Sequence, residues 1–399
     1  MTKFPARLIL PDELQPVFNQ LPWEIPLVEW PGQCKYLVEV PRGISRHPVE
    51  FVNLDGALYA IKEMSTELVE EEYIHLVALD ELRLPAVNPV GKVNTGGSAH
   101  ARSYLITKFL DKSLPYRSLF MSSSLSGYRD HLLDAMAGLL VQLHYKGVFW
   151  GDCSLSNTLF RRDVGTLQAY LVDAETVELS LGSLLPTMRL HDLQIMEENI
   201  AGDLADLSSQ NLLMNGLPLD DTSSSIRLRY QNLWEQINRQ IIIAPNERYR
   251  IHERIQALNS IGFSVGEVIV EPVENGDMIS FQVVVTDRNF HRDQLLGLTG
   301  VEAEEMQART MMNEILELKG RMSHNLDRST PISLAAFSWM EDYYQPMLEM
   351  LKPLIDQSGD PTELYCQVLE HKWYLSESAQ HDVGHHAAVE DFLQKFNSA

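Results

Sequence analysis

The feature that most constrains this 399-residue chain is the segment FWGDCSLSNTLF at 149–160, where polar residues interrupt an apolar run. Asp152 follows a glycine, and Asn157 comes five positions after Asp152. Gly, Asp and Asn favour turn geometry, so a bend between two strands would explain them. A phosphoryl-transfer site would use the same two side chains, because an Asp orients the nucleophile and an Asn holds a metal ion. The other segments of the chain decide between these two interpretations.

The acidic composition argues against several classes of partner. The chain contains 32 Lys and Arg against 55 Asp and Glu, which gives a formal net charge of −23. This charge repels nucleic acids and anionic membrane surfaces, so we expect no nucleic-acid partner. We recognise no signal peptide and no apolar stretch long enough to span a bilayer, so the sequence predicts a cytoplasmic protein without a membrane span.

The residues before this segment predict a β-rich region followed by helices. The stretches KYLVEV, VEFVNL and ALYAIKEM alternate apolar and polar residues between turn-forming residues, which predicts a β-meander over 35–64. Residues 66–84 and 126–145 place apolar residues at helical spacing, and Gly147 provides a C-terminal cap for the second helix. Two further strands are predicted between these helices.

The pattern changes after a polar stretch at 217–225, which we interpret as a linker or long loop. Residues 251–320 predict a helix, two alternating strands and a further helix, and the last seventy residues look helical. The first of these regions is compact enough to form a small α+β domain of its own.

Five polar residues occur on the predicted elements in an order that resembles the protein-kinase-like fold. Lys62 in YAIKEM resembles the strand lysine of kinases, and Glu72 in EYIHLVAL resembles the helix glutamate that pairs with it. Asp152 and Asn157 resemble the catalytic-loop aspartate and asparagine. Asp173 in YLVDAE resembles the aspartate of the DFG triplet.

The resemblance implies a role for each of these residues. Lys62, held by Glu72, would contact the phosphates of ATP, and Asp152 would act as the base or orienting group. Asn157 and Asp173 would be the ligands of Mg²⁺, which prefers hard oxygen atoms. ATP and Mg²⁺ are therefore the expected cofactors.

Other parts of the nucleotide site are predicted from the same resemblance. The segment PRGISRHPV stands where kinases have a glycine-rich loop, but it contains a single glycine. Three of its residues are predicted to contact the nucleotide, namely Gly43, Ser45 and Arg46. The backbone between the two lobes is predicted to bond the adenine, through Lys108, Phe109 and Leu110.

The chain departs from ordinary protein kinases at two positions. Trp150–Gly151 replaces the His-Arg pair that precedes the catalytic aspartate, and a glycine there resembles the lipopolysaccharide (Kdo/WaaP-type) kinases. Asp173–Glu175 reads DAE in place of DFG, so the phenylalanine switch is absent.

Longer phrases resemble one bacterial family over nearly the whole chain. LVQLHYKGVFWGDCSLSNTLFRRD and LTGVEAEEMQARTMMNEI are similar to proteins that join a lipopolysaccharide-kinase-like domain to a C-terminal domain of unknown function, DUF4032. The predicted fold class is α+β, a two-lobed kinase-like fold followed by an α+β and helical domain. The predicted parts are a leader at 1–33, a β-rich lobe at 34–110, a helical lobe at 111–240 and a DUF4032-like domain at 241–399.

These expectations lead to one preferred function and two alternatives. The preferred function is an atypical ATP–Mg²⁺-dependent phosphotransferase that acts on a hydroxyl of a small molecule, glycan or protein. The first alternative is a pseudokinase or nucleotide-binding scaffold that regulates a protein partner through contacts of its C-terminal domain. The second is an atypical Ser/Thr protein kinase.

Two further features are candidates for chemistry. Cys153 lies next to Asp152, so its oxidation would inactivate the site. The tract QHDVGHH at 380–386 resembles a cluster of metal ligands, although a helical surface tract explains it better.

Overall fold

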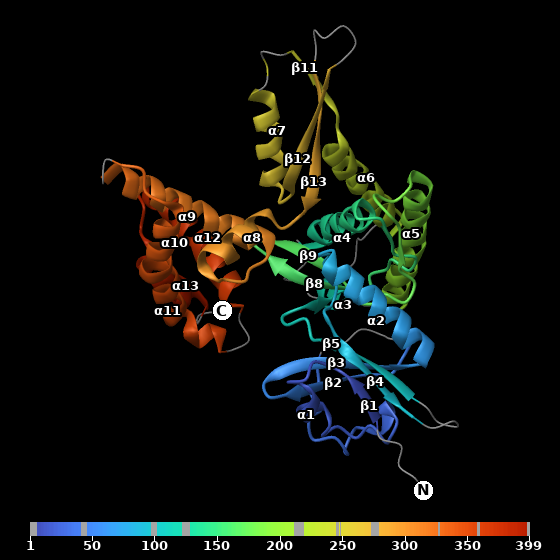
Figure 1. The fold of residues 1–399 in the computed structure, drawn as a ribbon. Coiled ribbons are helices and arrows are strands. Elements are labelled where there is room, and N and C mark those ends of the chain that lie inside the picture. Colours follow the sequence, from blue (N-terminus) through green and yellow to red (C-terminus); the bar gives the residue numbers. More distant parts are fainter. Residues whose placement is uncertain are drawn as a thin grey trace. The chain divides into compact units, whose positions relative to one another are not determined.

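The structure is a computed structural model (Figure 1), and it describes residues 6–40, 46–96, 102–121, 128–210, 219–244, 247, 249–272, 279–325, 328–356 and 360–396. The chain divides into two compact units. The first unit consists of Met1–Arg161 and Leu167–Leu233, and the second of Arg162–Thr166 and Trp234–Ala399. Both contain helices and strands, which confirms the predicted α+β class.

A five-stranded antiparallel sheet begins the first unit, with the strand order β1-β4-β5-β3-β2. The strands are β1 (Ala6–Ile9), β2 (Val49–Leu54), β3 (Ala57–Met64), β4 (Pro89–Thr95) and β5 (Arg102–Lys108). The hairpin of β2 and β3 confirms two strands of the predicted meander. The third predicted strand, KYLVEV, does not form a regular strand. It lies antiparallel to β2 through an isolated bridge between Leu37 and Val52, with the N–H of Val38 donating to Phe51 at 3.0 Å and the N–H of Asn53 donating to Tyr36 at 2.9 Å.

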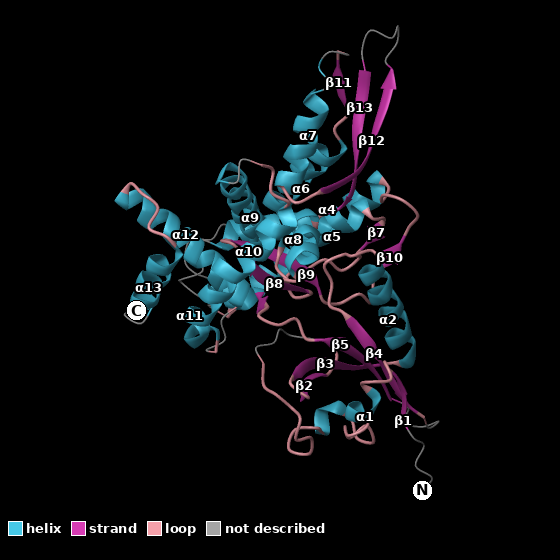
Figure 2. Ribbon diagram, turned by 60° about the vertical axis from the view of Figure 1, so that its left-hand side comes forward, coloured by secondary structure: helices cyan, strands magenta, loops and turns pink. Residues whose placement is uncertain are grey.

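The two faces of this sheet are covered by different elements. On one face, apolar residues of the leader pack against the sheet, among them Phe18, Trp23 and Trp30. On the other side, helix α2 (Thr66–Glu81) contacts β4 and β5 (Figure 2). Ser65 caps the first turn of α2 by accepting the N–H of Leu68 at 3.3 Å. Because side chains alternate along a strand, β3 directs Ile61 into the leader-side core and Lys62 toward α2.

The rest of the first unit is mainly helical. Its elements are β6 (Leu114–Pro115), α3 (Tyr116–Met121), α4 (Tyr128–Tyr145), β7 (Val148–Phe149), β8 (Thr158–Asp163), β9 (Thr166–Leu171), β10 (Glu178–Leu179), α5 (Pro186–Ser209) and α6 (Leu219–Asn238). Helix α4 is almost entirely buried between Leu132 and Leu143. Two short sheets support the loops that follow α4. One pairs β7 with β10, and the other contains β6, β8 and β9.

The second unit combines a three-stranded sheet with a helical core. The order β11-β13-β12 is formed by β11 (Ile241–Ile243), β12 (Ser264–Pro272) and β13 (Ile279–Asp287), and α7 (Tyr249–Ser260) lies beside it (Figure 1). The helices that follow are α8 (Phe290–Thr299), α9 (Glu305–Asn325), α10 (Ile332–Trp339), α11 (Gln345–Ile355), α12 (Pro361–Ala379) and α13 (His385–Phe396). A π-helical turn, η4 (Met340–Tyr344), joins α10 to α11.

Buried carboxylates cap the N-terminal ends of two of these helices. Asp163 accepts the N–H groups of Met306 at 3.1 Å and Gln307 at 2.9 Å, so it caps the first turn of α9. Glu305 accepts the N–H groups of His291 and Arg292 and caps α8 in the same way. Among the described residues, no helix combines the length and the apolar composition needed to cross a bilayer.

Candidate functional site

The ammonium of Lys62 lies at the centre of a group of carboxylates. Its Nζ is 3.0 Å from Glu72 Oε2, 3.0 Å from Asp173 Oδ2 and 2.8 Å from Glu175 Oε1. The predicted pair of Lys62 and Glu72 is therefore formed, and it joins β3 to α2. Asp173 and Glu175 follow strand β9, so the same lysine connects both halves of the first unit.

Burial and charge act in opposite directions on these groups. Burial alone would lower the pKa of Lys62, but the charges of Glu72 and Asp173 outweigh burial and raise that pKa above its ordinary value. Burial raises the pKa of Glu72, Lys62 opposes this rise, and the charges of Asp173 and Glu175 add to it. The lysine is thus charged at neutral pH within a group that carries excess negative charge.

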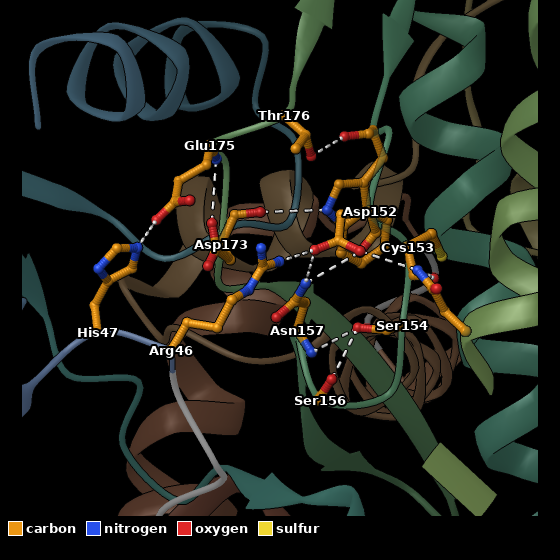
Figure 3. A network of polar contacts seen from close by, with 12 residues as sticks. Arg46, His47, Asp152, Cys153, Ser154, Ser156, Asn157, Asp173, Glu175 and Thr176 are labelled. Carbon is orange, nitrogen blue, oxygen red and sulfur yellow. Dashed lines mark hydrogen bonds and ion pairs between the residues drawn. The ribbon is translucent and has the colours of Figure 1, made fainter. Parts of the chain in front are cut away.

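The Asp152 carboxylate receives hydrogen bonds from three side chains (Figure 3). Its Oδ2 accepts Arg46 Nη2 at 2.7 Å and Asn157 Nδ2 at 3.0 Å, and its Oδ1 accepts Asn199 Nδ2 at 3.0 Å. The amide nitrogen of Asn157 therefore faces Asp152, which leaves the Asn157 carbonyl oxygen as the atom that could bind a metal. These bonds fix the orientation of Asp152.

A second aspartate, which is buried, holds the backbone of this loop. Asp192 on α5 accepts the N–H of Trp150 at 2.8 Å and the N–H of Gly151 at 3.0 Å. Nε2 of His144 is 3.0 Å from the same carboxylate, and Nδ1 of His144 is 2.8 Å from the Tyr230 hydroxyl. Burial lowers the pKa of His144, so the neutral imidazole donates to Asp192 and accepts from the hydroxyl.

Helix α5 supplies further support that the sequence analysis did not predict. Asp203 accepts the N–H groups of Leu155 at 2.9 Å and Ser156 at 3.1 Å, while Asn199 holds Asp152. Asp192, Asn199 and Asp203 are separated by seven and four residues, so they lie on one face of the helix. A polar stripe at this spacing was the signal that could have identified them.

The unusual Trp150–Gly151 pair has a structural reason. Gly151 adopts a φ of 79°, and a Cβ there would lie 2.8 Å from the carbonyl oxygen of Thr176. Trp150 is fully buried, and its indole N–H donates to the carbonyl of Asp173 at 3.3 Å. The pair therefore links the Asp152 loop to the segment that carries Asp173.

One cavity of about 960 Å³ brings the predicted residues of the first unit together. Lys62 lines this cavity, and so do eight other predicted residues, namely Arg46, Glu72, Lys108, Phe109, Leu110, Asp152, Asn157 and Asp173. Gly43 and Ser45 lie outside the described residues. The volume is within the range of small-molecule pockets.

The wall predicted to bind adenine offers few backbone donors. The N–H of Lys108 donates to Asn88 at 2.9 Å, and the N–H of Phe109 donates to Leu58 at 3.0 Å. Both N–H groups are therefore already hydrogen-bonded within the β-rich lobe. Of the three predicted residues, Leu110 is the one whose N–H has no partner in the described part of the chain.

The two other candidates do not form reactive sites. Cys153 is fully buried, and burial raises the pKa of its thiol well above the ordinary value, so both its lack of exposure and its protonation disfavour oxidation. In the tract QHDVGHH, His385 pairs with Glu314 at 2.8 Å while His386 lies exposed on the helix surface. Among the described residues, the cluster of side chains close enough together to hold a metal ion is instead formed by Glu72, Asp173 and Glu175.

Comparisons with known proteins identify the C-terminal region. Residues 232–396 match the family model described as "Domain of unknown function (DUF4032)", which confirms the predicted DUF4032-like region. None of the curated proteins compared with this chain is significantly similar to it. The chain also resembles a solved structure titled "WaaP in complex with acyl carrier protein", with a TM-score of 0.37 and 14% sequence identity. That match covers 64% of this chain and 96% of the other, and a likeness of this degree does not indicate a function.

Proposed function

We propose that the first unit binds ATP with Mg²⁺ and transfers the terminal phosphoryl group to a hydroxyl acceptor. The observation that carries this proposal is the contact of Lys62 with Glu72 and Asp173 on the wall of the cavity that also contains Asp152 and Asn157. Enzymes of this kind act mainly by positioning groups and stabilising charge. A cation for phosphate, a carboxylate for the hydroxyl and oxygen ligands for a metal are all present in this cavity.

The residues present fit the nucleotide and the metal. The carboxylate of Asp173 and the carbonyl oxygen of Asn157 are hard ligands of the type that Mg²⁺ prefers. Apolar side chains at the β-rich end of the cavity, such as Leu105 and Phe109, suit a nucleobase. When bound, Mg²⁺–ATP would supply the transferable phosphoryl group and a metal charge that compensates the phosphates.

The protein would position the acceptor through Asp152. One carboxylate oxygen of Asp152 would orient the acceptor hydroxyl and take its proton. Asn157 and Asn199 hold this carboxylate through neutral amide donors, so they fix its orientation without pairing its charge. Lys62 would hold the phosphates while Glu72 fixes the lysine.

A nucleotide-binding scaffold without transferase activity is the second candidate. The observation that favours it is the ion pair of Arg46 with Asp152, because this arginine occupies the oxygen that an acceptor would need. Such a scaffold would bind nucleotide and act through the C-terminal DUF4032 region.

The test is to measure Mg²⁺–ATP binding by calorimetry, and ATP turnover, with the full chain and with Asp173→Ala. We expect binding to the unchanged chain and its loss in Asp173→Ala, whereas Glu178→Ala, an exposed residue outside the cavity lining, keeps it. Mass spectrometry after incubation with ATP would separate the two candidates. Phosphate on the chain itself supports transfer, and absence of nucleotide binding would refute both.

A further inference from the structure

Arg46 makes an ion pair that the proposed reaction has to break. Its Nη2 lies 2.7 Å from Asp152 Oδ2, and these two residues are 106 positions apart in the chain. The arginine lies three residues before the first residue of β2, whereas Asp152 lies in the loop after β7. Figure 3 shows the guanidinium directed at the carboxylate. The pair therefore links the two halves of the first unit across the cavity.

Oδ2 of Asp152 has both of its acceptor positions occupied in this state. It accepts from Arg46 and Asn157, whereas Oδ1 accepts from Asn199 alone. An acceptor hydroxyl that donated to Oδ2 would have to displace Arg46 or Asn157. Asn157 and Asn199 are part-buried and fixed by the loop and α5, whereas the side chain of Arg46 is 75% exposed. Arg46 is thus the donor that can leave at the lowest cost.

A terminal phosphate is a better partner for Arg46 than Asp152 is. Ion pairs between exposed groups contribute little to stability, because water screens them and the long side chain loses freedom. A phosphate carries more charge than a carboxylate and can accept two parallel bonds from a guanidinium, whereas Arg46 makes a single bond to Asp152 in this structure. A triphosphate in the cavity would therefore draw Arg46 away from Asp152.

We propose that Arg46 exchanges between Asp152 and the terminal phosphate of the nucleotide, so that Oδ2 of Asp152 becomes available to the acceptor only after the nucleotide has bound. This inference rests on the proposed function, because it requires a nucleotide in the cavity. It makes Arg46 a positioning residue and predicts an ordered reaction, in which the nucleotide binds before the acceptor. After the exchange, Asn157 and Asn199 continue to hold the Asp152 carboxylate.

The reactivity of the Asp152 carboxylate reports on this exchange directly. The full chain would be treated with a carbodiimide and glycine ethyl ester, and amidation of Asp152 would be quantified by peptide mass spectrometry. Without nucleotide, we expect Arg46→Ala to increase amidation of Asp152 several-fold over the unchanged chain. Amidation of Asp206, an exposed carboxylate of the same cavity, serves as the internal reference. Arg7→Ala, which removes the same charge from exposed strand β1, is the matched control and should have no effect.

The nucleotide dependence separates exchange from simple shielding. Bound nucleotide shields Asp152 equally in both proteins, so the ratio of amidation in Arg46→Ala to that in the unchanged chain is the measured quantity. This ratio should approach one with a non-hydrolysable ATP analogue and Mg²⁺, and should stay several-fold with AMP, which lacks the terminal phosphate. Arg46→Lys, which keeps the charge but not the two parallel bonds, should give an intermediate ratio.

Three results would overturn the inference. Equal amidation of Asp152 in the unchanged chain and in Arg46→Ala without nucleotide would show that the ion pair does not protect it. A ratio that stays several-fold while calorimetry shows that the analogue is bound would refute the exchange and leave the proposed function standing. Failure of the analogue to bind at all would refute the exchange and the proposed function together.

Discussion

The carboxylate of Asp192 supports the backbone of the Asp152 loop, and its removal should open that loop by a predictable amount. It is fully buried and accepts the N–H of Trp150 at 2.8 Å, the N–H of Gly151 at 3.0 Å and Nε2 of His144 at 3.0 Å. Asp192→Ala leaves these three donors without an acceptor. Each unsatisfied buried group costs about 1–3 kcal/mol, and loss of one member of a buried charged network costs about 3–5 kcal/mol.

Hydrogen exchange measures this loss at the loop itself. Since about 1.4 kcal/mol corresponds to a factor of ten, a loss of 3–5 kcal/mol raises exchange of the Trp150 and Gly151 amides by roughly 100- to 4,000-fold. Asp206→Ala, an exposed aspartate on the same helix, should leave these amides unchanged. Exchange of these amides in Asp192→Asn should fall between the rates in the other two variants, because the Asn side chain keeps one acceptor oxygen but turns an N–H donor toward the loop. Equal exchange in Asp192→Ala and Asp206→Ala would refute the supporting role.

Three further predictions concern pH, backbone geometry and thiol reactivity. Burial, with the charge of Glu304, raises the pKa of Asp163 from 3.8 to about 7, so the folded state holds this proton more tightly than the unfolded state. The stability of the second unit should therefore fall by at most about 4 kcal/mol between pH 4 and pH 7, and urea denaturation of Asp163→Asn should lack this slope. Gly147→Ala should destabilise the first unit by about 1–3 kcal/mol in thermal unfolding, because the φ of Gly147 is 78° and a Cβ there would lie 2.1 Å from a carbonyl oxygen. Gly202→Ala is the control: its Cβ meets no atom within 4 Å, so this variant should be neutral or stabilising. All three cysteines, including Cys153, are buried, so a disulfide reagent should modify none of them rapidly in the native chain and all of them in urea.

Local patterns account for the parts of the fold that the sequence predicted. Lys62 could be assigned to a strand because apolar and polar residues alternate around it, and Glu72 to a helix because Leu76 and Leu79 follow at helical spacing. Strand β1 was missed because its partner is β4, where Ala6 pairs with Thr95. A pairing between segments so far apart leaves no local signal in four residues.

The support of the candidate site was harder to predict than its polar residues. Asp152 and Asn157 stand out because they interrupt an apolar run. Asp192, Asn199 and Asp203 lie in a helix that contains many other polar residues, and nothing in their spacing alone says which loop they face. Their role depends on tertiary packing of α5 against the loop, which the sequence pattern does not specify.

Under the proposed function, the charges in the cavity predict that the nucleotide and the metal bind together. Both cations to which the proposal assigns phosphate binding are paired in this structure, Lys62 with Glu72 and Asp173 and Arg46 with Asp152. Binding a triphosphate would therefore exchange one set of ion pairs for another and would leave carboxylates without their cations. A part-buried carboxylate that loses its partner is costly, so under the proposed function the free energy of binding depends on what compensates Asp173 once Lys62 binds phosphate. A divalent metal bound by Asp173 and Asn157 would provide that compensation, and nucleotide affinity should accordingly fall steeply when the metal is removed by chelation.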